Sequence, residues 1–172
     1  MEPVKLLRPA TIAPARALAL KPEIELFNAE YCAVLDAGDV EAWPAFFTED
    51  AVYRVTAREN AERNLPVGLV YAEGRPMMED RAVAIGRTQM FAPRYSLHLV
   101  TNTRVLSEED GRIVAQANFV LLQTLVEGPT TIHMAGTYYD VFVRGEAGTL
   151  LLQERQCIYD TTIIANDLVY PL

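Results

Sequence analysis

Cysteine and long apolar runs are both scarce in this sequence. Its two cysteines, Cys32 and Cys157, lie far apart along the 172 residues. No apolar run approaches the roughly 20 residues that span a bilayer, and no N-terminal stretch joins basic residues to a continuous apolar segment as a secretory signal does. We therefore expect a protein of the reducing cytoplasm, with free thiols and no membrane partner.

Basic residues are also few. The formal net charge is −8 at pH 7, and no block of Lys or Arg occurs anywhere in the chain. Such a sequence gives phosphate backbones and anionic lipids nothing to bind, so we expect no nucleic acid partner. What the sequence does contain is 51% apolar and 22% charged residues. This composition is typical of one globular domain with a good-sized core.

The first 21 residues differ from the rest. They carry Pro3, Pro9 and Pro14 without a repeating apolar face, and we interpret residues 1–21 as an irregular arm, either disordered or laid on a partner. Residues 22–172 would then form the domain. Pro22 is suited to opening a helix, which Gly38 would end. The apolar residues of this helix recur at helical spacing: Ile24, Phe27, Tyr31, Val34 and Leu35.

A second helix and a mixed region are expected next. Asp39 is a candidate cap for a short helix. An apolar, mostly aromatic stripe, which we interpret as core, would lie along one side of it: Val40, Trp43, Phe46 and Phe47. Beyond this helix we expect strands over residues 51–57 and 67–71 with a polar loop between them. A third helix is expected from Gly74 and Pro76 to Ile85.

From Arg94 onward the sequence has the composition of long strands. Turn residues separate four of them, at Asp110-Gly111, Gly128-Pro129 and between Gly145 and Gly148. The pattern predicts a four-stranded antiparallel meander over residues 96–106, 113–126, 130–143 and 149–164. Helices followed by a meander form an α+β layout, with the helices packed on a strongly curved antiparallel sheet. This order is similar to the cone-shaped, cystatin-like fold of nuclear transport factor two, ketosteroid isomerase and scytalone dehydratase.

Four segments carry a more specific resemblance. Residues 36–55, DAGDVEAWPAFFTEDAVYRV, closely resemble the start of the small (β) subunits of aromatic-ring-hydroxylating dioxygenases. Further matches follow in the order of that family: MEDR at 78–81, HLVTNTRV at 98–105 and AGTYYDV at 135–141. Together they cover about residues 23–170. The closing run from Leu152 to Leu172 looks more like the oxygenases of carboxylated aromatics, such as terephthalate, than the naphthalene or biphenyl group.

The resemblance implies a non-catalytic subunit of an oxidoreductase. In that family the small subunit associates as a trimer and joins three large (α) subunits in an α3β3 hexamer. A Rieske [2Fe–2S] cluster, a mononuclear iron and the substrate pocket would lie on the α subunit, with electrons supplied by a separate reductase or ferredoxin. The small subunit would fix the geometry of the α subunits. The chain alone is expected to be inactive, with no catalytic, cofactor-binding or metal-binding residues of its own.

The inventory of possible metal ligands fits that division. A Rieske cluster takes two Cys and two His, and the iron takes two His and a carboxylate. This chain has two of each, with His98 and His133 as its histidines, so a cluster would leave no histidine for the iron. A lone iron or zinc held by His98, His133 and a carboxylate remains a geometric alternative. No dinucleotide, Walker or nucleophile-elbow motif supports nucleotide, flavin or serine-hydrolase chemistry.

A rival interpretation comes from the cone fold itself, whose pocket can hold an acid and a base. Asp50, Tyr53 and His98 would form an acid–base group for a cofactor-independent isomerase or dehydratase, with Arg94 binding an anionic substrate. By period two, His98 would share one face of its strand with Val100, Asn102 and Arg104. The structural alternative is that His98, Asn102 and Arg104 form hydrogen bonds at a subunit boundary or along the sheet. A plain ligand-binding module is a third possibility.

Overall fold

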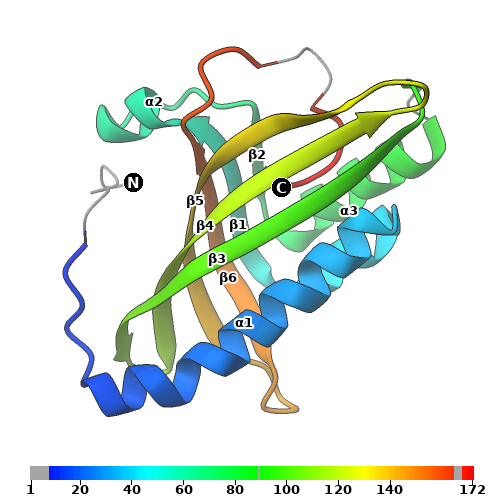
Figure 1. Cartoon of the computed structure of the whole chain (residues 1–172). Coiled ribbons are helices and arrows are strands. Elements are labelled where there is room, and N and C mark those ends of the chain that lie inside the picture. Colours follow the sequence, from blue (N-terminus) through cyan, green and yellow to red (C-terminus); the bar gives the residue numbers. More distant parts are fainter. Residues whose placement is uncertain (1–7, 89, 165–167) are drawn as a thin grey trace.

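The computed structural model describes residues 8–88, 90–164 and 168–172. Helices come first and long strands last, as the α+β layout predicts (Figure 1). In chain order the elements are α1 (Pro14–Asp36), the 3₁₀ helix η1 (Val40–Phe46), β1 (Phe47–Ala57), α2 (Arg58–Glu62), β2 (Val70–Glu73), α3 (Arg75–Val83), the π-helical turn η2 (Ala84–Thr88), β3 (Arg94–Glu109), β4 (Arg112–Leu125), β5 (Thr130–Arg144) and β6 (Leu150–Tyr159). None of the described helices has the length and apolarity needed to cross a bilayer.

One six-stranded sheet has the order β2-β1-β6-β5-β4-β3. The predicted antiparallel meander is confirmed, because β3, β4, β5 and β6 pair in sequence with antiparallel registers. The sheet is not wholly antiparallel, since β1 pairs with β6 in parallel. The last strand of the meander, β6, lies beside β1, and the two strands run in the same direction. In Figure 1 the sheet twists strongly and α1 runs alongside β3, the last strand of the sheet.

The first helix is longer than predicted. It begins at Pro14 rather than Pro22, so residues 14–21 belong to α1 and not to the arm. Proline is tolerated in the first helical turn, where its missing N–H has no partner to lose. Pro22 lies inside α1, and the alanines, leucines and arginine between the two prolines favour helix strongly enough to bridge it. The part of the arm that is described lies on this chain's own sheet, where Thr11 and Ile12 donate backbone hydrogen bonds to the Leu106 carbonyl.

Smaller boundary differences have local causes. The short strand predicted over residues 67–71 is Val70–Glu73, and the predicted polar loop includes the one-turn helix α2. The last strand ends at Tyr159 instead of continuing to residue 164. There Asp160 turns away and pairs with Arg58 at 2.6 Å. Residues 160–164, the last part of the predicted strand, are therefore not in a strand.

The predicted polar face of β3 is wrong at one end. His98 is buried as the period-two pattern requires, but Asn102 and Arg104 are exposed, while Thr103 and Val105 are buried. A bulge interrupts the register between residues 101 and 104. Asn102 adopts the left-handed conformation, with φ of +56°. Because a bulge inserts one extra residue into the strand, it exchanges the inner and outer faces beyond that point.

The aromatic stripe around η1 is core, as predicted. Trp43 and Phe47 are fully buried and meet edge to face with ring centroids 5.4 Å apart. Tyr53 packs on Trp43 at 5.0 Å in the same manner. Rings in this arrangement contribute about 0.5–1.5 kcal/mol beyond the area that they bury. They join the short helix to β1 and help to close the cone.

Gly136 on β5 provides a test of how tightly the curved sheet is packed. A Cβ there would lie 2.2 Å from the backbone oxygen of Ile158 and 2.7 Å from the Cα of Tyr159. Because both atoms are backbone, they cannot move aside cheaply. We expect Gly136→Ala to lower the free energy of unfolding by more than about 2 kcal/mol in urea titrations.

Gly128→Ala is the matched control for Gly136→Ala. Its Cβ would come no closer than 3.4 Å to another atom, so the change in unfolding free energy should stay within about 1 kcal/mol. Equal, small effects of the two substitutions would show that β5 and β6 are not held as closely as described.

Candidate functional site

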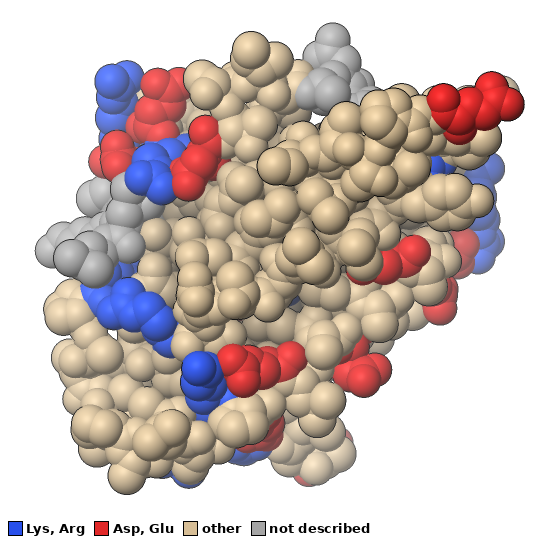
Figure 2. Space-filling model, in the orientation of Figure 1, with Lys and Arg blue, Asp and Glu red and all other residues tan. Residues whose placement is uncertain are grey.

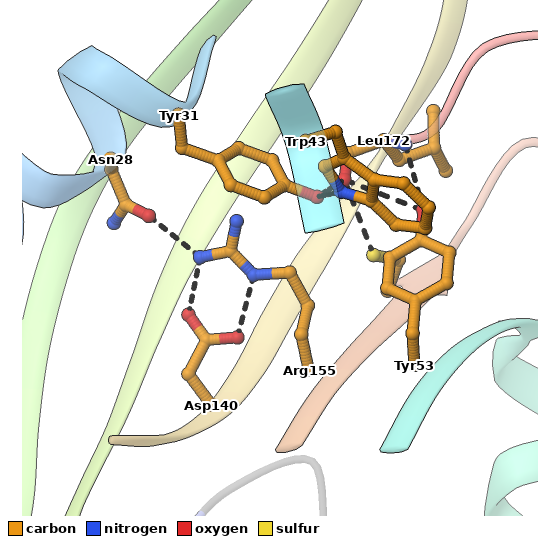
Figure 3. Close-up of polar contacts among 8 residues, drawn as sticks. Asn28, Tyr31, Trp43, Tyr53, Asp140, Arg155 and Leu172 are labelled. Carbon is orange, nitrogen blue, oxygen red and sulfur yellow. Dashed lines mark hydrogen bonds and ion pairs between the residues drawn. The ribbon is translucent and has the colours of Figure 1, made fainter. Parts of the chain in front are cut away.

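A buried ion pair lies at the centre of the cone. Arg155 on β6 donates from Nε and Nη2 to the two carboxylate oxygens of Asp140 on β5, at 2.9 and 2.8 Å (Figure 3). The two residues are direct cross-strand partners in the sheet. Both are almost fully buried, with 0% and 2% of their surface exposed. Burial works against the charged guanidinium, but Asp140 more than offsets this, and the pKa of Arg155 is raised above its ordinary value.

Side chains from both sides hold the guanidinium in place. Tyr31 and Tyr138 stack on it, with the guanidinium carbon 4.3 and 4.1 Å from the ring centroids. Asn28 on α1 accepts a hydrogen bond from Arg155 Nη2 at 2.6 Å. The first helix is therefore fixed to the centre of the sheet by a charged group that neither water nor salt screens well.

A second polar chain runs through the same core. Trp43 Nε1 donates to the Tyr31 hydroxyl, which donates to the backbone oxygen of Leu172, each at 2.8 Å. The Leu172 N–H in turn donates to the Tyr53 hydroxyl at 2.8 Å (Figure 3). Tyr53 thus has a structural partner, and burial raises the pKa of its hydroxyl well above the ordinary value. This residue is not available as an acid or a base near neutral pH.

The acid–base group of the rival interpretation is not assembled. Asp50 is exposed and accepts a hydrogen bond from Thr48 at 2.8 Å, while Tyr53 holds Leu172. His98 instead turns toward α1, where its Nδ1 lies 2.6 Å from Asp36 Oδ1. Arg94, the anion-binding residue of the rival interpretation, donates to the Ala92 backbone oxygen at 3.0 Å. Each of these side chains therefore makes polar contacts of its own, in different parts of the chain.

Arg104 forms hydrogen bonds along the sheet, as the structural alternative predicts. It donates to Gln116 Oε1 at 2.8 Å and to the Arg8 backbone oxygen at 3.2 Å.

The metal site considered for His98 and His133 is not formed in the described part of the chain. These two histidines are separated in the sheet, because β4 lies between β3 and β5. Among the residues that the structure describes, no three or more His, Cys, Asp and Glu side chains gather as a metal site would require.

Sequence reasoning missed Asp36, Asn28 and the Asp140–Arg155 pair. Asp140 and Arg155 both lie in segments interpreted as strands and as parts of the family resemblance, without a role for either side chain. The available signal was an Arg in the middle of the predicted strand over residues 149–164, with an Asp in the neighbouring strand. Pairing them requires the hairpin register, which is fixed by a turn and a bulge and not by composition.

The outer face of the meander is the feature of the surface that suits a partner. Across β3, β4 and β5 the outward side chains form cross-strand rows, one of Leu97, Leu122 and Ile132 and the next of Leu99, Val120 and Ala135. Leu97, Leu99 and Ile132 are 51%, 48% and 71% exposed. We call these six residues the outer apolar face.

Charge is absent around the outer apolar face. Residues 95–103, 117–126 and 130–138 contain no Asp, Glu, Lys or Arg. Figure 2 shows an uncharged area across the middle of the view, where Figure 1 draws β3 and β4, with most acidic and basic side chains toward its margins. An apolar, uncharged patch of this kind on a sheet marks a protein contact more often than bare surface.

Comparison with known proteins shows the family of this chain. A family model described as "Ring hydroxylating beta subunit" matches residues 31–166. The chain belongs to this family. It is 33% identical to the anthranilate 1,2-dioxygenase small subunit of Burkholderia cepacia over 87% of this chain and 92% of that protein. It is 31% identical to subunit β 1 of the terminal oxygenase component of terephthalate 1,2-dioxygenase from a Comamonas species, over 87% and 97%.

Solved structures agree with the family and with the predicted cone fold. A protein assigned as the β subunit of an aromatic-ring-hydroxylating dioxygenase from Novosphingobium aromaticivorans superimposes with a TM-score of 0.81 at 35% identity, over 90% of this chain and 98% of that one. A protein from the same organism assigned as a scytalone dehydratase shares the fold alone, with a TM-score of 0.68 at 19% identity over 89% and 92%. This β-subunit family member therefore has the α+β cone fold.

Arg155→Met tests whether the buried pair stabilises this β subunit. The substitution keeps an apolar stem but leaves Asp140 as a buried carboxylate without its cation. We expect a loss of about 3–5 kcal/mol in the free energy of unfolding, measured by denaturant titration.

Arg144→Met is the matched control for Arg155→Met. Arg144 pairs with Glu23 at 2.6 Å, but their side chains are 41% and 38% exposed, so the expected loss is below about 1 kcal/mol. Similar losses in the two variants would contradict the central role given to Arg155. Adding Asp140→Leu to Arg155→Met should restore part of the stability, because it removes the isolated charge.

Proposed function

We propose that this chain is a non-catalytic small subunit that assembles and positions the large subunits of a Rieske-type aromatic-ring dioxygenase. The outer apolar face carries the proposal, because it combines exposed aliphatic side chains with an absence of charge in the neighbouring segments of three adjacent strands. A rigid sheet, fixed from behind by the Arg155–Asp140 pair, provides a surface of constant shape for such contacts. Fixed shape is what a subunit needs if it is to set the geometry of others.

The stoichiometry that we propose is a β trimer within an α3β3 hexamer. A closed ring of three identical chains presents three equivalent positions for larger subunits. The relatives named small subunit and subunit β support a division of labour between chains. We assign the Rieske [2Fe–2S] cluster and the mononuclear iron to the α subunit, since two Cys and two His in this chain are too few to ligate both. The free, buried thiols of Cys32 and Cys157 fit a cytoplasmic complex.

The substrate class that we propose for the complex is an aromatic carboxylate. Anthranilate and terephthalate, named for the two relatives reported above, are both benzene rings with carboxylate groups. The ring and its carboxylate would be bound by the α subunit. In this chain the side chain predicted to bind an anion, Arg94, is on β3 and makes a hydrogen bond to its own neighbouring loop. The small subunit would therefore affect specificity only through the geometry of the complex.

Reconstitution with the matching α subunit separates this proposal from the isomerase or dehydratase alternative. We expect the isolated chain to turn over no aromatic acid, even with a reductase and NADH. His98→Ala should lower stability or hexamer yield, because it removes the partner of Asp36, while product per assembled iron stays nearly constant. A catalytic acid or base would instead cost about 10² to 10⁴-fold in rate with assembly intact. That second pattern, in the chain alone, would overturn the proposal.

Leu97→Glu tests the outer apolar face directly. Leu97 is half-exposed on β3 and has only Leu122 as its neighbour in the same row on β4, so a carboxylate should be tolerated in the isolated chain. In an assembled complex it would be buried without a partner, at a cost of several kcal/mol. Sedimentation of the reconstituted complex should show at least a hundredfold weaker assembly.

Leu18→Glu is the control for Leu97→Glu. Leu18 is 71% exposed on α1, away from the outer apolar face, so the same substitution there should leave assembly unchanged. If Leu97→Glu forms hexamers as readily as Leu18→Glu does, the outer apolar face is not the contact surface.

A further inference from the structure

The segment that joins α2 to β2 is an apolar surface loop. Residues 64–72 contain no Asp, Glu, Lys or Arg. Three large aliphatic side chains in this segment are between 39% and 59% exposed: Leu65, Val67 and Leu69. A single exposed leucine is ordinary, but neighbouring ones without any charge among them are typical of a surface that contacts another protein. We call residues 65–69 the apolar loop.

Buried polar side chains of β1 hold the apolar loop in place. Arg54 and Thr56 are both buried. Arg54 donates to the carbonyl oxygen of Leu65 at 2.5 Å, and Thr56 donates to that of Val67 at 2.7 Å. Because the backbone is fixed before any partner arrives, binding through these side chains would cost little conformational entropy.

A surface that could receive the apolar loop lies between α1 and β3, where there is a cleft of about 750 Å³. Ala29 and Ala33 line it from the helix, and Leu99 and Val100 line it from the strand. Leu99 also belongs to the outer apolar face, so the cleft adjoins the surface already proposed as a contact. Its volume is several times that of a leucine side chain, so side chains of the apolar loop would fit.

The charges beside the two surfaces are opposite. Glu25 lines the cleft, and its contact with Lys21 at 3.7 Å is an exposed pair that contributes little. Asp36, the other carboxylate of the cleft, is bound to His98. Arg63, two residues before the apolar loop, is exposed and takes part in none of the ion pairs among the described residues. A cation beside the loop and a carboxylate beside the cleft favour contact between these two surfaces.

Both surfaces belong to the same chain but to different parts of the sheet. The apolar loop leads into β2, at one end of the strand order, whereas the cleft borders β3, at the other end. A contact between two such unlike surfaces joins copies head to tail, which is the kind of contact that closes a ring of three. A twofold dimer would instead pair each surface with itself. A second copy of this chain is therefore the partner that offers the complementary surface.

We infer that the apolar loop of one copy of this chain binds in the α1–β3 cleft of the next copy, with Arg63 facing Glu25 across the contact. The inference rests on the β trimer proposed above and assigns the surfaces that form it. Only the Leu99 border of the outer apolar face is used, so the rest of that face remains for the large subunits.

Charge reversal tests the contact in the full chain, both alone and reconstituted with the α subunit. Arg63→Glu and Glu25→Arg should each weaken association of the chains about tenfold in sedimentation experiments, because each places like charges together. The double variant should regain most of the wild-type association, since every contact again joins opposite charges. Arg112→Glu is the control and should change nothing, because Arg112 is exposed but lies outside both surfaces. A double variant that associates no better than the single ones would overturn the inference.

Cross-linking tests the location. Ala33→Cys places a thiol at the cleft, and Val67→Cys places one in the apolar loop. With a short bis-maleimide, a mixture of the two variants should give covalent pairs, while either variant alone should give none. The native thiols of Cys32 and Cys157 are buried, and the wild-type chain measures any background from them.

The outcomes separate this inference from the trimer on which it rests. Wild-type chains that do not associate with one another, alone or in the complex, would contradict the trimer and the inference together. Chains that associate but give no covalent pairs in the mixture, or give pairs within one variant, would contradict the inference alone. So would a Val67→Cys variant that links only to the large subunit.

Discussion

The Arg155–Asp140 pair constrains the rest of the fold. It joins two neighbouring strands at one register, and through Asn28 it also fixes the rotation and position of α1 against the sheet. A buried pair of this kind contributes little net stability compared with an apolar replacement, but it tolerates few alternative arrangements. A slip of one residue in β6 would leave a guanidinium facing an apolar neighbour. We therefore attribute to this pair the single register in which β5 and β6 are paired, more than the overall stability of the fold.

The elements that could be predicted from the sequence are those set by local pattern. The meander follows from long runs of strand-forming composition and from turn residues such as Asp110-Gly111, and η1 follows from its aromatic stripe. The family follows from ordered segments such as residues 36–55. Where two local signals compete, the prediction fails. Pro22 indicates a helix start, yet the helix-favouring residues before it and Pro14 extend α1 beyond that point.

The rest depends on contacts between residues distant in sequence. The bulge at Asn102 exchanges the faces of β3, and no periodic pattern reveals a bulge in advance. The parallel pairing of β1 with β6 forms only after the meander is complete. The candidate site was harder still. The Asp36–His98 contact joins the end of a helix to a strand 62 positions later, and no local pattern in the sequence indicates that these two residues are neighbours.

The edges of the sheet differ from its outer face, and this difference affects how copies can associate. At one edge β2 has only four residues. At the other, backbone groups of Thr11 and Ile12 cover the Leu106 end of β3, and the Asp36 carboxylate binds the His98 N–H further along. Exposed strand edges are where sheets add further strands without limit and grow into fibrils. With one edge short and the other partly capped, this chain can expose a broad apolar face while disfavouring uncontrolled, edge-to-edge polymerisation.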